Sequence, residues 1–320
     1  MARRTPLPRE LVGKPFAVTG AIALGVSRER LRGRDLHAPF SGVRTTEPML
    51  DLESRCRAFS TVMRADDHFS HVTAARLWGI PLPAAFEADP RLHVTRTRGS
   101  ATVRRGLVGH ETSPRLVLVQ RGLALSTPAD TWCELATCRL PGGRTLTRDE
   151  LIVAGDRLFA WPQPLATRGE VADAMIRHTG GRGIRVLREA LREVRPGSAS
   201  PRESRLRLLV VRAGFPEPEL NGPIRLRIGT TVHGDLVFRA YRVVLEYEGD
   251  QHRTDARQFM RDVDRVNSLN DAGWRVIRVH RGTSDATVLA WLEAGLRARG
   301  WRGVAPIAPR SSSFSSRRDS

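Results

Sequence analysis

The sequence predicts a mixed α/β protein, α+β overall, built from successive parts. Helical periodicity alternates with short apolar strands along the whole chain, which is typical of this class. A chain of 320 residues, 40% of them hydrophobic, is long enough for more than one core. A turn-rich stretch at residues 195–201 marks an internal boundary. We expect a helix-turn-helix or winged-helix-like module over 1–48, a mixed α/β region over 49–196, an α/β domain over 197–300 and a disordered basic tail over 301–320.

The charge balance is strongly basic. Lysine and arginine number 52 against 34 acidic residues, giving a net charge of +18, and Lys14 is the only lysine. The arginine guanidinium presents a planar fork of donors that fits phosphate groups and guanine edges. Arginine-rich codon usage explains the ratio of arginine to lysine but not the net excess, so we expect DNA as a partner.

Cysteine usage and apolar runs indicate the compartment. The three cysteines, Cys56, Cys133 and Cys138, have no partners at zinc-site spacing and form no disulfide framework, which favours a reducing environment. No apolar run approaches the roughly 18 residues of a membrane span, and the first residues lack a signal-peptide pattern. We therefore expect a cytoplasmic protein without a membrane partner.

The first 48 residues suggest a helix-turn-helix. Residues 17–24 have helical periodicity, Gly25 makes a turn, and Ser27 can cap a second helix. Residues 39–44 suggest a short extended wing. The candidate DNA contacts are the arginines of the second helix, Arg28, Arg30 and Arg32. A small helical cap with a solvated basic face is the alternative.

The middle region alternates helices and strands. The predicted helices are 70–79, 130–136 and 182–193, and the predicted strands are 92–95 and 116–119. The local cluster Asp66, Asp67, His68 and His71 contains metal-ligand types. We interpret it as an ordinary helix start, because nothing else in the segment converges on His71.

The C-terminal domain has a simple predicted order: a helix, three strands, a helix and a strand. The first helix has Ser200 as a cap, and Pro201 fits its first position. Gly229 suits a hairpin turn between the first two strands. The predicted elements are a helix over 201–213, strands over 224–228, 232–238 and 242–247, a helix over 255–272 and a strand over 274–279.

Carboxylates gather on the predicted strands of this domain. Asp235 lies in one strand, and Glu246 and Glu248 lie two residues apart on the next, so they share a face. Their neighbours 243–245 are apolar, which indicates a buried strand where carboxylate repulsion must be offset. A hard cation, Mg²⁺ or Mn²⁺, is the natural partner, and Glu203 could supply a further carboxylate. Solvated carboxylates on an open sheet face are the alternative.

Several ordered motifs over about 80 residues carry a family resemblance. They are Ser200-Pro201-Arg202-Glu203-Ser204, then Asp235, then Leu245-Glu246-Tyr247-Glu248-Gly249-Asp250-Gln251-His252, then Arg261-Asp262, then Gly273-Trp274-Arg275-Val276-Ile277-Arg278-Val279. They resemble an uncharacterised family abundant in actinobacteria, related to the very-short-patch-repair endonucleases of the PD-(D/E)XK superfamily. This implies a restriction-endonuclease-like mixed sheet flanked by helices. The preceding region, including residues 73–79, is similar to the antitoxins of type IV abortive-infection systems.

The resemblance implies a mechanism. Asp235 and Glu246 would hold the metal, which activates a water and stabilises charge on the scissile phosphate. Glu203 matches a first-helix glutamate that supports the metal. Glu248 occupies the slot of the family's usual lysine.

Two polar residues that follow the strand extend the implied site. Gln251 and His252 would orient the water or contact phosphate. A histidine on its own is more often structural, and that reading of His252 stays open.

Basic residues follow the predicted site. Residues 202–281 carry 15 arginines against 11 acidic residues. Arg253, Arg257 and Arg261 recur at helical spacing and could line a groove for the DNA backbone, with Arg253 and Arg257 as the candidate contacts. A salt-bridged helix face, with Asp262 and Asp264 as partners, is the alternative.

The first functional hypothesis is a Mg²⁺- or Mn²⁺-dependent DNA endonuclease that hydrolyses phosphodiester bonds, with an N-terminal DNA-binding module. The alternative is a DNA-binding regulator or antitoxin-like protein whose nuclease fold is inactive, since the lysine is missing. An RNA nuclease is a third reading, although no aromatic stacking surface favours it. The sequence does not identify a toxin or repair partner.

Overall fold

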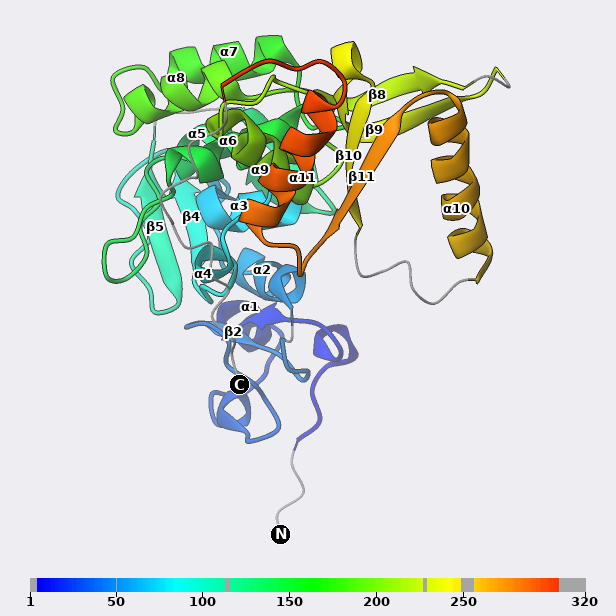
Figure 1. The fold of residues 1–320 in the computed structure, drawn as a ribbon. Helices are drawn as coiled ribbons and strands as arrows, with labels where there is room; N and C mark the ends of the chain where they lie inside the picture. The colour runs from blue at the N-terminus through cyan, green and yellow to red at the C-terminus, as the bar shows by residue number, and fades with distance from the viewer. Residues whose placement is uncertain (1–4, 50, 113–115, 227–228, 249–255, 305–320) are drawn as a thin grey trace. The chain divides into compact units, whose positions relative to one another are not determined.

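The computed structural model describes residues 5–49, 51–112, 116–226, 229–248 and 256–304 (Figure 1). Two compact units divide the chain. The N-terminal unit comprises residues 1–151 and 166–189, and the C-terminal unit comprises residues 152–165 and 190–320. No helix in the described ranges is both long enough and apolar enough to cross a bilayer.

The N-terminal unit begins with short elements. The strand β1 (Phe16–Ala17) pairs antiparallel with β2 (Val43–Arg44), and the helix α1 (Val18–Ala23) follows β1. The predicted first helix and the turn at Gly25 are confirmed, Gly25 having a φ of 82°. The predicted second helix is wrong: only a 3-10 helix, Arg30–Arg32, forms there.

The sequence explains why that second helix stops after one turn. The Ser27 hydroxyl accepts a hydrogen bond from the Arg30 backbone N–H, so Ser27 caps the turn as expected. Gly33 then adopts an extended conformation, with a ψ of 139°, and ends the helix. The described residues therefore form a helix and a capped turn here, and not a helix-turn-helix.

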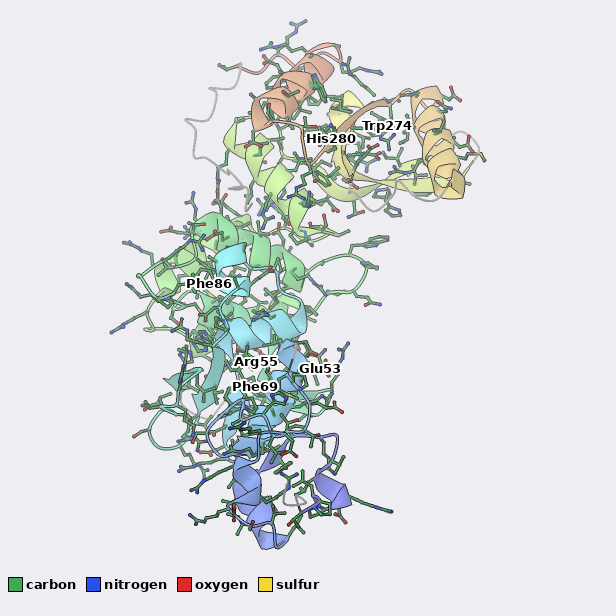
Figure 2. All side chains as sticks on the ribbon, turned by 90° about the horizontal axis from the view of Figure 1, so that it is seen from below. Glu53, Arg55, Phe69, Phe86, Trp274 and His280 are labelled. Carbon is green, nitrogen blue, oxygen red and sulfur yellow. The ribbon has the colours of Figure 1, made fainter. Side chains whose placement is uncertain are left out.

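A five-stranded mixed sheet forms the centre of this unit, in the order β5-β4-β3-β7-β6. Its strands are β3 (Asp67–Phe69), β4 (Leu92–Arg96), β5 (Leu107–Glu111), β6 (Val117–Gln120) and β7 (Leu123–Ser126). The unit's helices are α2 (Leu52–Ser60), α3 (His71–Trp78), α4 (Ala84–Glu87), α5 (Pro128–Leu135) and α7 (Arg168–Arg177). Phe69, labelled in Figure 2, is buried with Phe59 and Leu92 in its core.

A four-stranded mixed sheet forms the centre of the C-terminal unit, in the order β11-β10-β9-β8. Its strands are β8 (Glu219–Arg225), β9 (Thr231–Phe238), β10 (Val243–Glu248) and β11 (Arg275–His280). The pairs β8–β9 and β9–β10 are antiparallel, whereas β10–β11 is parallel. A parallel pair needs a crossover connection, and the helix α10 (Ala256–Asp271) lies in that connection.

Helices cover both faces of this sheet. Figure 1 shows α10 on one side and α9 (Pro201–Arg212) and α11 (Asp285–Arg297) on the other. Leu245 belongs to the core on the side of α9 and α11, while Val244 belongs to the core with Trp274 and Leu269 on the α10 side. Two further helices are α6 (Arg148–Leu158) and α8 (Ile184–Glu193).

The predicted α+β class is confirmed, and the predicted element order of the C-terminal domain is found. The largest difference in bounds is at β8, which runs from Glu219 to Arg225 and not over 224–228. Pro223 lies inside it, which disfavours a strand, but β8 is the edge strand and tolerates a missing N–H. Residues 227–228, and 305–320 of the predicted tail, lie outside the described residues.

Candidate functional site

Asp235 lies where β9 and β10 separate. The two strands pair from Val243↔Phe238 to Leu245↔Leu236 and no further, while β10 continues to pair with β11. The Tyr247 backbone N–H donates instead to Asp235 Oδ2, at 2.8 Å. The side chain thus replaces a ladder hydrogen bond and is held at the gap between the strands.

Glu203 reaches the same region from α9. Ser200 caps this helix by accepting from the Glu203 N–H, which places Glu203 in the first turn as predicted. Glu203 Oε2 accepts hydrogen bonds from the Ala199 N–H at 2.8 Å and from Asn221 Nδ2 at 3.2 Å. Burial raises the pKa of this carboxyl, while these hydrogen bonds oppose the shift.

Glu246 is held by a cation from α10. Arg265 Nη1 donates to Glu246 Oε2 at 2.9 Å, and Arg265 Nη2 lies 2.6 Å from Oε1. The second contact is an ion pair without hydrogen-bond geometry, so the buried Oε1 has no hydrogen-bond partner among the described residues. Arg265 also donates to the His233 carbonyl oxygen.

The pKa of Asp235 depends on its burial and on both glutamates. Burial raises its pKa to about 7, with further contributions from the negative charges of Glu203 and Glu246, while Arg265 acts in the opposite direction. Carboxylates that repel one another in a buried site favour a proton or a metal ion. We call Asp235 and Glu246 the acidic pair.

Glu248 is placed differently from the acidic pair. It lies two residues beyond Glu246 on β10, and its side chain forms an ion pair with Arg278 on β11. Its side chain is 41% exposed, against 8% for Glu246. Tyr247, between them, stacks under the Arg202 guanidinium of α9. Glu248 therefore lies with a neighbouring arginine at the exposed end of the strand.

The structure describes only part of the remaining predicted site. Gln251, His252 and Arg253 lie outside the described residues. Arg257 lies in α10, but its side chain is outside them.

The N-terminal arginines have unequal environments. The Arg30 guanidinium pairs with Asp35 at 2.8 Å and donates to the Thr5 carbonyl oxygen, so it is already engaged. Arg28 and Arg32 are exposed. Their role as DNA contacts remains a prediction.

The chemistry of the acidic pair fits a hard divalent cation. Two carboxylates on neighbouring strands, one with an elevated pKa and one paired with Arg265, are oxygen ligands of the kind that Mg²⁺ and Mn²⁺ prefer. Glu203, Asp235 and Glu246 do not form a group whose ligand atoms all lie within 4.8 Å of one another. Within the described ranges such a group is formed by His71, His93 and His110.

Two features of the structure were not predicted from the sequence. Arg265 was not singled out, although it continues the four-residue spacing of Arg257 and Arg261 and could have been found that way. The convergence on His71 was also missed, because the strand register that brings in the other histidines is not visible in a local pattern.

Comparisons with known proteins give distant relatives. Two curated proteins described as uncharacterised, from the CDC 1551 / Oshkosh and ATCC 25618 / H37Rv strains of Mycobacterium tuberculosis, are each 28% identical to this chain over 232 residues. The match covers 72% of this chain and 80% of each relative. No protein-family model matches the chain, and no solved structure matches it significantly.

Proposed function

We propose that the C-terminal unit is a metal-dependent DNA endonuclease that hydrolyses phosphodiester bonds at the acidic pair. The observation that carries the proposal is the position of Asp235 at the gap between β9 and β10, beside the buried Glu203 and Glu246 carboxylates that help to raise its pKa. A site that concentrates buried negative charge on a sheet between helices is suited to bind Mg²⁺ or Mn²⁺.

Each residue has a defined part in this proposal. Asp235 and Glu246 would hold the metal, which when bound supplies charge stabilisation for the phosphate and lowers the pKa of a water. Glu203 raises the negative potential on Asp235 and anchors the start of α9. Arg265, which pairs with Glu246, would supply positive charge for a bound phosphate.

The direct test is cleavage of supercoiled plasmid DNA by the full chain with Mg²⁺ or Mn²⁺. We expect nicked and linear products from the wild type. Asp235→Asn and Glu246→Gln should each lower the rate about 100-fold or more, because the metal's charge stabilisation is worth several kcal/mol. Glu219→Gln is the matched control, since this exposed carboxylate on β8 pairs with Arg239.

Three outcomes would contradict the proposal. Intact plasmid with either metal, from protein that still binds DNA, would favour the regulator with an inactive nuclease fold. Equal cleavage by wild type and both variants would indicate a contaminating nuclease. Cleavage of RNA in place of DNA would assign a different substrate to the acidic pair.

A further inference from the structure

The N-terminal unit brings together three histidines from different segments. His71 is the first residue of α3, His93 lies on β4 and His110 lies on β5. In the parallel β4–β5 register His110 is opposite Thr95, and Thr95 shares a face with His93. One face of the sheet therefore carries both strand histidines next to the start of α3. We call these three residues the histidine cluster.

The three imidazole rings are in direct contact. His93 Nδ1 lies 3.0 Å from His110 Nε2, and the His71 and His110 rings stack with centroids 3.5 Å apart. One ligand nitrogen from each ring lies within 4.8 Å of the other two. Three ring nitrogens thus converge on one small volume.

Two histidines of the cluster are buried, and one of their ring nitrogens lacks a hydrogen-bond partner in the described part of the chain. His71 and His93 are 7% and 2% exposed. His93 Nε2 is buried and has no hydrogen-bond partner in the described part of the chain. A ligand bound at this nitrogen would satisfy it.

The surroundings of His71 fix its backbone and ring. Its φ is 50°, a strained value for a residue with a side chain, and its N–H donates to the buried carboxylate of Glu134 at 2.9 Å. Its Nδ1 contacts the Ser70 hydroxyl at 2.9 Å, which leaves Nε2 for another partner. This resembles the way outer-shell groups orient metal-binding histidines.

We propose that the histidine cluster is a transition-metal site of the zinc class, separate from the acidic pair. Imidazole ligands select Zn²⁺, Co²⁺, Ni²⁺ or Cu²⁺, whereas Mg²⁺ prefers oxygen. No fourth histidine, cysteine or carboxylate joins the group in the described ranges, so one coordination position is left for water or an added ligand.

The rings must adjust when the metal binds. His93 can bind the metal through its unsatisfied Nε2 or through Nδ1. In the second case Nδ1 and His110 Nε2 move from 3.0 Å to about 3.3 Å apart, the spacing of two nitrogens bound tetrahedrally at zinc distances. The His71 ring is held at Nδ1 by Ser70, so its Nε2 is the nitrogen offered to the metal. The neutral state needed for binding is already favoured, because burial lowers the pKa of His93 to about 3 and of His110 to about 4.

The test is Co²⁺ titration of metal-free full-length protein carrying Asp235→Asn, which removes a ligand of the acidic pair. We expect one equivalent to bind with the intense visible absorption of four-coordinate Co²⁺, and Zn²⁺ to displace it. His93→Gln and His110→Gln should each weaken Co²⁺ affinity more than about 100-fold, since a direct ligand counts for more than an outer-shell group. His37→Gln, at an exposed histidine of the same unit, is the control.

A measurement on the unsubstituted cluster covers the case in which a variant fails to fold. Pulsed EPR of the Cu²⁺-loaded Asp235→Asn protein should detect at least two coordinated imidazoles. The proposal is overturned by weak octahedral Co²⁺ absorption alone, by folded His93 and His110 variants that bind as tightly as the control, or by fewer than two imidazoles on Cu²⁺.

Discussion

Asp235 combines a structural and a chemical role in one carboxyl group. Its Oδ2 accepts the Tyr247 N–H where the strands separate, and its burial beside Glu203 and Glu246 raises its pKa to about 7. A proton and the proposed metal ion would therefore compete for the same oxygens, so metal affinity should rise with pH through neutrality.

Replacing Asp235 should change the pH dependence of stability. The raised pKa means that the folded state holds a proton between about pH 4 and 7 that the unfolded state has lost, so wild-type stability falls across this window. Asp235→Asn keeps an acceptor for Tyr247 and does not titrate. In EDTA we expect it to gain stability over wild type on the order of 4 kcal/mol at pH 8 and nothing at pH 3, measured by urea unfolding. A constant difference at both pH values would contradict this assignment.

Gly234, next to Asp235, is required by close packing. A Cβ atom added there would lie 2.7 Å from Val244 Cγ1 and 3.0 Å from Val237 Cγ2. Gly234→Ala should therefore destabilise the protein by about 1–3 kcal/mol, as overpacking of a dense core does, in a chemical denaturation experiment. The control is Gly214→Ala, where no atom lies within 4 Å of the added Cβ and only the backbone conformation is strained. If Gly214→Ala loses more stability than Gly234→Ala, close packing is not the cause of the effect at Gly234.

At the scale of elements, α9 shows what the sequence could and could not predict. Its start followed from Ser200 and Pro201, and both are found at the N-cap and the first position. The burial of Arg207 could not be predicted from the sequence, because the residues around it indicate only an amphipathic helix. In the structure Arg207 is 1% exposed and donates to Asp156 on α6 at 3.1 Å and to the Glu193 carbonyl oxygen.

The same contrast applies to the candidate site. Alternation on a strand predicted that Glu246 and Glu248 share a face, and the apolar neighbours predicted burial of Glu246. The partners of the two glutamates come from α10 and from the parallel strand β11. Such contacts depend on tertiary packing and strand register, which no local pattern specifies.

The buried Arg207–Asp156 pair gives a test at this scale. Removing one partner leaves an uncompensated buried charge, so Arg207→Met should cost about 3–5 kcal/mol in the free energy of unfolding. The double variant Arg207→Met, Asp156→Leu should recover part of the loss, because neither charge is then buried alone. A double variant less stable than Arg207→Met would show that the pair is not the cause.

For the whole molecule, the net charge of +18 predicts DNA binding that weakens with salt. Two exposed arginines of the N-terminal unit, Arg28 and Arg32, are the proposed contacts there. Each phosphate contact contributes about 0.9 to the slope of log affinity against log salt concentration. Arg28→Gln with Arg32→Gln should lower the slope by up to about 2 in a fluorescence anisotropy titration.

Removing the charge of an arginine outside the proposed contact surface is the control for that titration. Arg57 on α2 pairs with Glu53 at 2.6 Å, so Arg57→Gln should leave the salt slope nearly unchanged. An unchanged slope in the Arg28 and Arg32 variant would remove these residues from the DNA contact surface.

The acidic pair as a hard-metal site is the central claim, and direct Mn²⁺ binding tests it most closely. Metal-free full-length protein should be titrated with Mn²⁺ and the free ion followed by EPR at pH 6 and pH 8. We predict one Mn²⁺ ion whose binding strengthens from pH 6 to pH 8 and is lost in both Asp235→Asn and Glu246→Gln, while Glu219→Gln binds like wild type. Mn²⁺ binding that is the same in wild type and both acidic-pair variants would contradict the account.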